Sequence, residues 1–298
     1  MSRARKHHTV PQFLLRNFAV DLEKKKVTSV AKFGKMAVWK ERSIGSIGYE
    51  PDFYVHSRNG QAVSVEEDIN RLVETPITRS QTWAKIKNGH TETLDASDRG
   101  VLQALIKHFE FRTPHYRATG EELVSLALSD QKEIPFADEE RRFFELLGKS
   151  PGSAKVLQNR RSTTSIEQLQ TSSSMVLVKR SPIALRTSTT PVIPIKAPHH
   201  PAMNLPLPGM VPFQRVLAVD PTTLIILVEG EFNGAFSNEA IDEETAIGLN
   251  KTFLAYFAKF PHMDHLITGR ERLIEDMCWG PFELVEEQES QVIFRRTD

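Results

Sequence analysis

The chain has 298 residues, of which 40% are hydrophobic and 26% charged, and its 38 Lys and Arg balance its 38 Asp and Glu. This composition is that of a globular protein with a sizeable core, and its neutrality argues against a non-specific DNA binder. No apolar run approaches the ~20 residues of a membrane span, and the start of the chain lacks the apolar core of a secretory signal. The single cysteine, Cys278, excludes an internal disulfide, so we expect a cytoplasmic protein.

Charge is distributed unevenly along the chain. Residues 1–45 carry eleven Lys and Arg against three acids, a net charge of +8, whereas residues 229–298 carry six bases against fifteen acids, a net charge of −9. Two interpretations remain open. The two ends attract each other across the fold, or the basic segment binds a polyanion such as nucleic acid.

The segment Lys6–Ala19 reads KHHTVPQFLLRNFA and combines two imidazoles, a guanidinium and an amide with large apolar side chains. Pro11 suits the first turn of a helix, and Thr9 is a candidate cap before it. The pattern therefore predicts a helix that begins near Pro11.

The polar residues of this segment are candidates for a site. His7 and His8 would face the N-terminus of the helix, which favours anions, with Arg16 and Asn17 further along. We therefore predict a phosphate or carboxylate pocket in which His7 or His8 is the general acid or base and Arg16 holds the anion, supported by Asn17. The alternative is a buried helix whose histidines bond to core carbonyls.

The next elements follow from periodicity and turn residues. Val27–Phe33 and Met36–Glu41 flank Gly34-Lys35 and predict a hairpin, and a third strand is expected near Ser46–Tyr49. Helical spacing then begins at Val65, and Pro76 is expected to end or kink that helix. The helices expected after it are Thr78–Lys87, one capped by Asp95 or Ser97 that ends near Phe111, Gly120–Ser129, Asp138–Leu147, Ser153–Leu169 and Glu239–Phe260.

Arg112 follows an apolar helix face in the sequence Phe111-Arg112-Thr113-Pro114. A guanidinium at such a position is expected to be buried, and a buried charge must be paired or must bind an anion. Arg112 is therefore a second candidate anion-binding residue.

The C-terminal half is predicted to be richer in strands. They are expected at Met175–Lys179, Ile183–Thr187, Val192–Ile195, Gln214–Val219 and Leu224–Val228. Lys196–Val211, with four prolines, is expected to be a surface loop. The spacing of His262, Asp264 and His265 could allow them to bind a divalent metal. The segment is expected to be a loop, and the sequence places no further ligand beside it. No metal ligand is therefore assigned, and the cofactor remains open.

The N-terminal pattern His-His-x-Val-Pro-x-Phe-x-Leu-Arg-x-Phe resembles that of an uncharacterised bacterial family, domain of unknown function 4238, and the Arg-Thr-Pro after the helix is similar too. The resemblance implies that Asp52, before Phe53-Tyr54, is a polar residue beside the histidines. It also matches Asn250 to a family asparagine. Thr189 and Thr190 stand where the family carries Asp and Asn, so a catalytic acid or metal ligand of relatives would be missing here.

Together these patterns predict an α+β fold, with central helices packed on a C-terminal, mostly antiparallel sheet and a small N-terminal β-hairpin region. We expect a single domain built from residues 1–55, 64–170 and 174–298. The leading functional hypothesis is a hydrolase, similar to a phosphodiesterase, that acts on a phosphate-containing small molecule or nucleic acid. The alternative is a non-catalytic binding or assembly protein with a structural His/Arg network.

Overall fold

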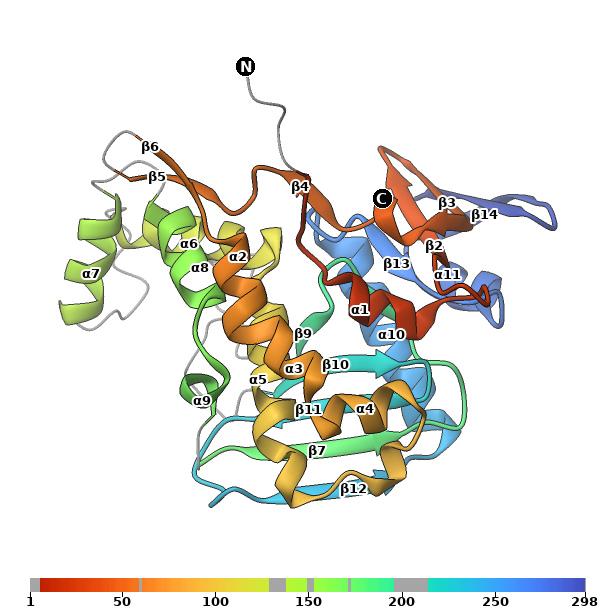
Figure 1. Cartoon of the computed structure of the whole chain (residues 1–298). Coiled ribbons are helices and arrows are strands. Elements are labelled where there is room, and N and C mark those ends of the chain that lie inside the picture. Colours follow the sequence, from red (N-terminus) through yellow and green to blue (C-terminus); the bar gives the residue numbers. More distant parts are fainter. Residues whose placement is uncertain are drawn as a thin grey trace.

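The computed structural model describes residues 6–58, 61–128, 138–148, 153–170, 173–195 and 214–297 (Figure 1). Helices occupy most of the middle of the chain, and strands precede and follow them. The predicted α+β class is therefore confirmed. The predicted loop Lys196–Val211 lies outside the described residues.

Most of the predicted helices are present, with altered ends. Pro114 begins α6 instead of only breaking the helix before it, as its fixed φ and missing N–H allow at a first helical position. Ser165 forms a capping box that starts α9, so the helix predicted over Ser153–Leu169 is two helices. The helices are α1 (Gln12–Leu15), α2 (Glu66–Ile69), α3 (Thr75–Arg79), α4 (Gln81–Lys87), α5 (Arg99–Phe111), α6 (Pro114–Leu128), α7 (Asp138–Gly148), α8 (Ser153–Ser162), α9 (Ile166–Leu169), α10 (Glu243–Lys259) and α11 (Leu273–Trp279).

The strands of the C-terminal half are shared between two sheets instead of one. The five-stranded sheet has the order β12-β7-β11-β10-β9, and all its pairs are antiparallel except β12 with β7. In Figure 1, α5 crosses in front of this sheet and α10 lies behind it. Its strands are β7 (Met175–Arg180), β9 (Val192–Ile195), β10 (Gln214–Asp220), β11 (Thr223–Val228) and β12 (Phe236–Ala240).

The second sheet has six strands, all antiparallel, in the order β14-β15-β3-β2-β13-β8. The predicted hairpin is present as β2 and β3, with Gly34 at φ +60° in its turn. It is not a separate small region, however, because a lone hairpin cannot bury its apolar residues and here β13 and β15 flank it. The strands are β2 (Lys26–Phe33), β3 (Met36–Ser43), β8 (Thr187–Ser188), β13 (His265–Ile267), β14 (Phe282–Glu287) and β15 (Gln291–Arg296).

Two short pairs of strands complete the described structure. β1 (Lys6–His8) pairs with β4 (Tyr49–Pro51), and β5 (Val55–Arg58) pairs with β6 (Gln61–Ser64). The predicted strand near Ser46–Tyr49 is thus shifted toward Pro51. The two histidines of the N-terminal segment lie on β1, a strand that the sequence did not predict, and α1 begins four residues after His8.

The hydrophobic core joins segments that are far apart in the sequence. One cluster of buried side chains contains Val10 and Leu14 of the N-terminal segment, Phe109 of α5, Phe253 of α10 and Phe294 of β15. Such a core favours cooperative unfolding of the chain as one unit.

We therefore predict that a proteolytic cut near residues 171–174 does not release two folded halves. Residues 6–170 and 173–297 each expose core surface once separated, so both fragments should lose their fold. Limited proteolysis followed by gel filtration and circular dichroism of the separated fragments tests this. Two independently stable halves would contradict the single-domain prediction.

Candidate functional site

His7 is held in the interior by β1 and by the turn after β4. Its side chain is fully buried, and its ring stacks on Tyr54 with 5.5 Å between ring centroids. The Tyr54 backbone N–H donates to His7 Nδ1 (3.0 Å). A neutral imidazole that accepts at Nδ1 carries its proton on Nε2, which here lies 3.4 Å from Glu66 Oε2. Both ring nitrogens of His7 therefore face protein groups.

Arg112 ends α5 and is also buried, with 4% of its surface exposed. Its Nε donates to Tyr54 Oη (2.7 Å), and its Nη2 donates to the carbonyl oxygen of His8 (2.6 Å). Its Nη1 forms an ion pair with the Glu74 carboxylate. The prediction that this guanidinium is buried is confirmed, and the anion that it holds is a carboxylate of the chain itself.

Glu74 reaches Arg112 from an unusual turn. Residues Asn70–Glu74 form a π-helical turn between α2 and α3, and Pro76 follows in α3. A proline inside a helix lacks the N–H and clashes with the carbonyl four residues before it, and a π-turn can absorb this misfit. The helix therefore continues past Pro76 instead of ending there.

His108 completes this buried group, which we call the His–Arg cluster and define as His7, Tyr54, Glu74, His108 and Arg112. His108 Nε2 lies 3.6 Å from Glu74 Oε1 and 3.4 Å from Arg112 Nη1. Burial lowers the pKa of His108 to about 3, so its ring is neutral at pH 7. A neutral ring beside an ion pair points to a structural network.

His8 lies at the edge of the cluster and is half-buried. Its Nε2 is 3.0 Å from the Gln12 side-chain amide, and Arg16 Nη2 donates to Gln12 Oε1 (3.4 Å). Desolvation, followed by the positive charges of Lys6 and Arg112, lowers the pKa of His8. The neutral ring can then accept from Gln12, whose oxygen faces Arg16.

The supporting residues predicted from sequence lie elsewhere. Asn17 donates to the Val219 carbonyl (2.9 Å) at the five-stranded sheet. Asn250 on α10 accepts from the Arg186 N–H (3.0 Å) and donates to the Ala184 carbonyl (2.9 Å). Both amides thus bond to backbone groups of segments that are distant in the sequence.

Asp52 lies two residues before Tyr54, in the turn between β4 and β5. It adopts φ +52°, a left-handed conformation that Asp tolerates better than most residues. Its carbonyl accepts from Lys155 Nζ (3.0 Å). Asp52 thus lies in the turn that leads into Tyr54 of the His–Arg cluster.

Thr189 and Thr190, the residues that replace the family Asp and Asn, are both buried. Thr189 Oγ1 accepts from the His265 N–H (3.1 Å), and the Thr190 N–H donates to Ser188 Oγ (3.1 Å). Nearby in the chain, Arg186 pairs with Asp276. These hydrogen bonds and the Arg186–Asp276 ion pair hold the irregular segment around β8 in place.

The predicted spacing for a metal does not bring its residues together. His265 Nδ1 lies 3.3 Å from Ser29 Oγ, and His262 is exposed in the loop before β13. Across residues 6–297, apart from the gaps given above, no group of three or more His, Cys, Asp or Glu could hold a metal ion. In the same ranges, no helix has the length and apolarity to cross a membrane.

A surface cleft of about 650 Å³ adjoins the helix that follows β1. Four of its lining residues are cations and one is an acid, a net charge of +3. We call it the basic cleft. It is lined by Gln12, Phe13, Arg16, Asn17, Glu23, Lys24, Lys25, Ser43, Thr78, Trp83 and Lys87.

The N-terminal segment is therefore divided between two environments. His7 and His8 enter or border the His–Arg cluster, whereas Arg16 and Asn17 line the basic cleft. The predicted residues thus do not share one cleft. The sequence also did not identify Trp83 and Lys87, although their spacing of four places both on one side of α4.

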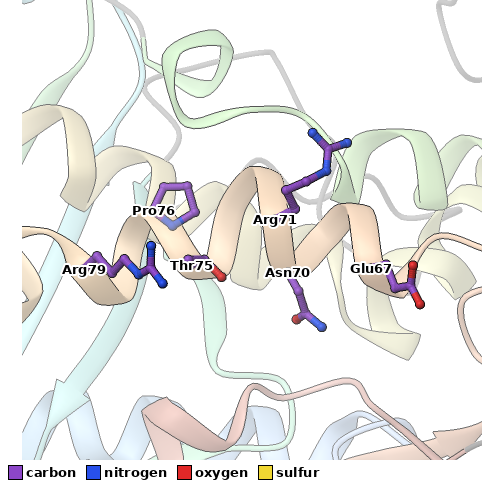
Figure 2. Close-up of a pocket in the computed structure, with 6 residues that line it drawn as sticks. All are labelled: Glu67, Asn70, Arg71, Thr75, Pro76 and Arg79. Carbon is purple, nitrogen blue, oxygen red and sulfur yellow. The ribbon is translucent and has the colours of Figure 1, made fainter.

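Another hollow, of about 570 Å³, runs along the helix from α2 to α3 (Figure 2). Figure 2 shows that its labelled residues, from Glu67 to Arg79, follow one continuous helix. Ligand sites generally gather polar groups from several elements around a concavity. The basic cleft, with walls from α1, the loop before β2 and α4, fits that description better.

The fold and these sites define an α+β protein with a buried His–Arg cluster beside a basic cleft. Residues 6–256 match the model of the family described as "Protein of unknown function (DUF4238)", and the chain belongs to this family. This confirms the resemblance seen in the sequence. Comparison with curated proteins gave no match, and comparison with solved structures gave none either.

Proposed function

We propose that the chain is a binding protein for a phosphate-containing ligand, which it holds in the basic cleft. The observation that carries the proposal is that the second half of the N-terminal motif lines this cleft together with lysines from two other segments. In this proposal the His–Arg cluster is structural and fixes the segment that carries Arg16.

The charges of the cleft suit a phosphate group. Arg16, Lys24, Lys25 and Lys87 line it against the single acid Glu23, which pairs with Lys25 (2.6 Å). A guanidinium recognises phosphate with two parallel hydrogen bonds, and lysines add point charges. The cleft volume also lies within the range of small-molecule sites, roughly 300–1,000 Å³.

The hydrolase hypothesis has weaker support. His7 is fully buried and faces Glu66, and Arg112 is already bound to Glu74, Tyr54 and a carbonyl. A general acid or base must come within hydrogen-bond reach of its substrate. A hydrolytic role would therefore fall to His8, which is half-buried and linked to Arg16 through Gln12.

The proposal predicts that Arg16→Gln/Lys87→Gln weakens the binding of pyrophosphate by about tenfold or more, since each lost cation removes a charge-assisted contact. Isothermal titration at low salt measures this. The parent's affinity should fall as salt rises. Both substitutions are at exposed positions, so the variant should melt within a few degrees of the parent.

The matched control is Arg71→Gln/Arg79→Gln, which also removes two positive charges but from the other hollow (Figure 2). Compared at about 0.15 M salt, it should change pyrophosphate affinity less than about twofold, because surface charges farther away than a Debye length of about 8 Å are then largely screened. Equal losses in both double variants would mean that only net charge matters. Failure of the parent to bind pyrophosphate at low salt would overturn the proposed function.

A further inference from the structure

We infer that the phosphate-containing ligand of the basic cleft is a nucleotide, whose base packs on Phe13 while its phosphate meets the cations. This inference rests on the proposed function and names the ligand class of the same site. The features that carry it are the aromatic residues of the cleft and their spacing from its cations.

Two separate helical segments each bring an aromatic ring and a cation to the cleft. Phe13 and Arg16 are three residues apart where α1 continues into a 3₁₀ turn, and Trp83 and Lys87 are four residues apart on α4. Side chains at these spacings lie on one side of a helix, about one turn of roughly 5.4 Å apart. A nucleotide likewise carries an aromatic base one sugar away from its phosphate.

Phe13 is held in place while part of its ring remains exposed. Its ring makes an edge-to-face contact with Trp83, with 4.9 Å between centroids, and packs against Phe109 at 5.6 Å. Unlike Leu14 and Leu15, which are fully buried, Phe13 is only partly buried and lines the cleft. An aromatic surface fixed in this way can receive a base with little loss of conformational freedom.

The residues that line the cleft also favour a nucleotide over a polyanion that has no base. Pyrophosphate would use only the four cations, whereas the partly exposed ring of Phe13, held by the buried Trp83, adds an aromatic surface among them. Aromatic stacking accepts any base because every base has a π-face. We therefore expect a preference for nucleotides over phosphates without a base, and little discrimination among bases.

The decisive comparison is between adenosine 5′-monophosphate and ribose 5-phosphate, which differ only in the base. Titration calorimetry on the full chain should show that the nucleotide binds about tenfold more tightly. Phe13→Leu keeps an apolar side chain but removes the ring, and it should bring the two affinities to within about twofold by weakening only the nucleotide. Phe33→Leu, at an aromatic that is 58% exposed in β2, is the matched control and should leave the preference unchanged.

The outcomes separate the two proposals. If ribose 5-phosphate and the nucleotide bind equally to the parent, the inference fails while the proposed function stands. If neither they nor pyrophosphate bind at low salt, the proposed function itself fails. The affinity ratio in the parent needs no variant, so the test holds even if Phe13→Leu does not fold.

A further arm identifies the source of the nucleotide. A single-stranded thymidine octamer is compared with thymidine 5′-monophosphate at equal salt. Tighter binding of the octamer that is lost in Phe13→Leu assigns the base to a nucleic acid strand. Tighter or equal binding of the monophosphate, lost in the same variant, assigns it to a free nucleotide. Binding of both that is unaffected by Phe13→Leu overturns the inference.

Discussion

Replacing Arg112 with alanine is expected to lower the free energy of unfolding by about 3–5 kcal/mol, because it leaves the mostly buried Glu74 carboxylate without its partner. The substitution also removes the donors to Tyr54 Oη and to the His8 carbonyl. Urea denaturation followed by circular dichroism measures the change. The control is Arg71→Ala, whose pair with Asp68 is exposed and should contribute less than about 1 kcal/mol.

A double variant tests whether the loss arises from the unpaired charge. Arg112→Met/Glu74→Met removes both charges and keeps apolar volume, so it should recover most of the stability lost in Arg112→Ala. One result would change the role assigned to Arg112. If Arg112→Ala melts with the parent but no longer binds pyrophosphate, Arg112 serves the ligand and the structural role is wrong.

The protein should lose stability as the pH falls below 7. Burial lowers the pKa of His108 to about 3 and those of His115 and His265 to about 4. In the unfolded chain each has an ordinary pKa near 6.5, so unfolding below that pH takes up protons and stability falls as pH falls. Each histidine contributes a slope of about 1.4 kcal/mol per pH unit between its folded and unfolded pKa.

The groups around His115 and His265 explain why neither of these two rings gains a compensating charge. His115 packs on the Phe260 ring, with His262 nearby adding positive charge. His265 contacts Ser29, and the positive charge of Arg42 further lowers its pKa. Protonation is therefore opposed in the folded state by desolvation first and by like charge second.

Urea denaturation at pH 7.5, 6 and 5 measures this dependence, and we expect a loss of several kcal/mol over the range. His265→Gln should make the slope shallower by about 1.4 kcal/mol per pH unit. His90→Gln is the control, because His90 is 65% exposed and should not alter the slope. A stability that stays flat from pH 7.5 to 5 would contradict the burial of these rings.

Local patterns predicted most elements correctly. Gly34 marked the turn of β2 and β3, and the helix expected to end near Phe111 is present as α5, with Leu102, Leu105 and Phe109 on its buried side. The burial of Arg112 also followed from its place between an apolar helix and Pro114. These signals are contained within a few turns of chain, so a single sequence reveals them.

Long-range pairing was not visible in the same way. β1 pairs with β4 more than 40 residues later, and nothing local sets that register. β14 has five consecutive exposed residues, so it lacks the alternation that marks a half-buried strand. The basic cleft draws on α1, the loop around Lys24 and α4, which are far apart in the sequence. The π-turn that presents Glu74 accompanies Pro76, which the sequence predicted would end or kink the helix.

The position of β1 has a consequence for how the chain is made. The ribosome produces β1 about 100 residues before Arg112, whose side chain supplies a hydrogen bond to the His8 carbonyl. Until the end of α5 emerges, the nascent chain therefore holds the carbonyl of His8 without its hydrogen bond from Arg112. Synthesis thus sets the earliest moment at which Arg112 can anchor the segment next to the basic cleft. A pause in translation before Arg112 would prolong the interval in which β1 is held by β4 without this anchor.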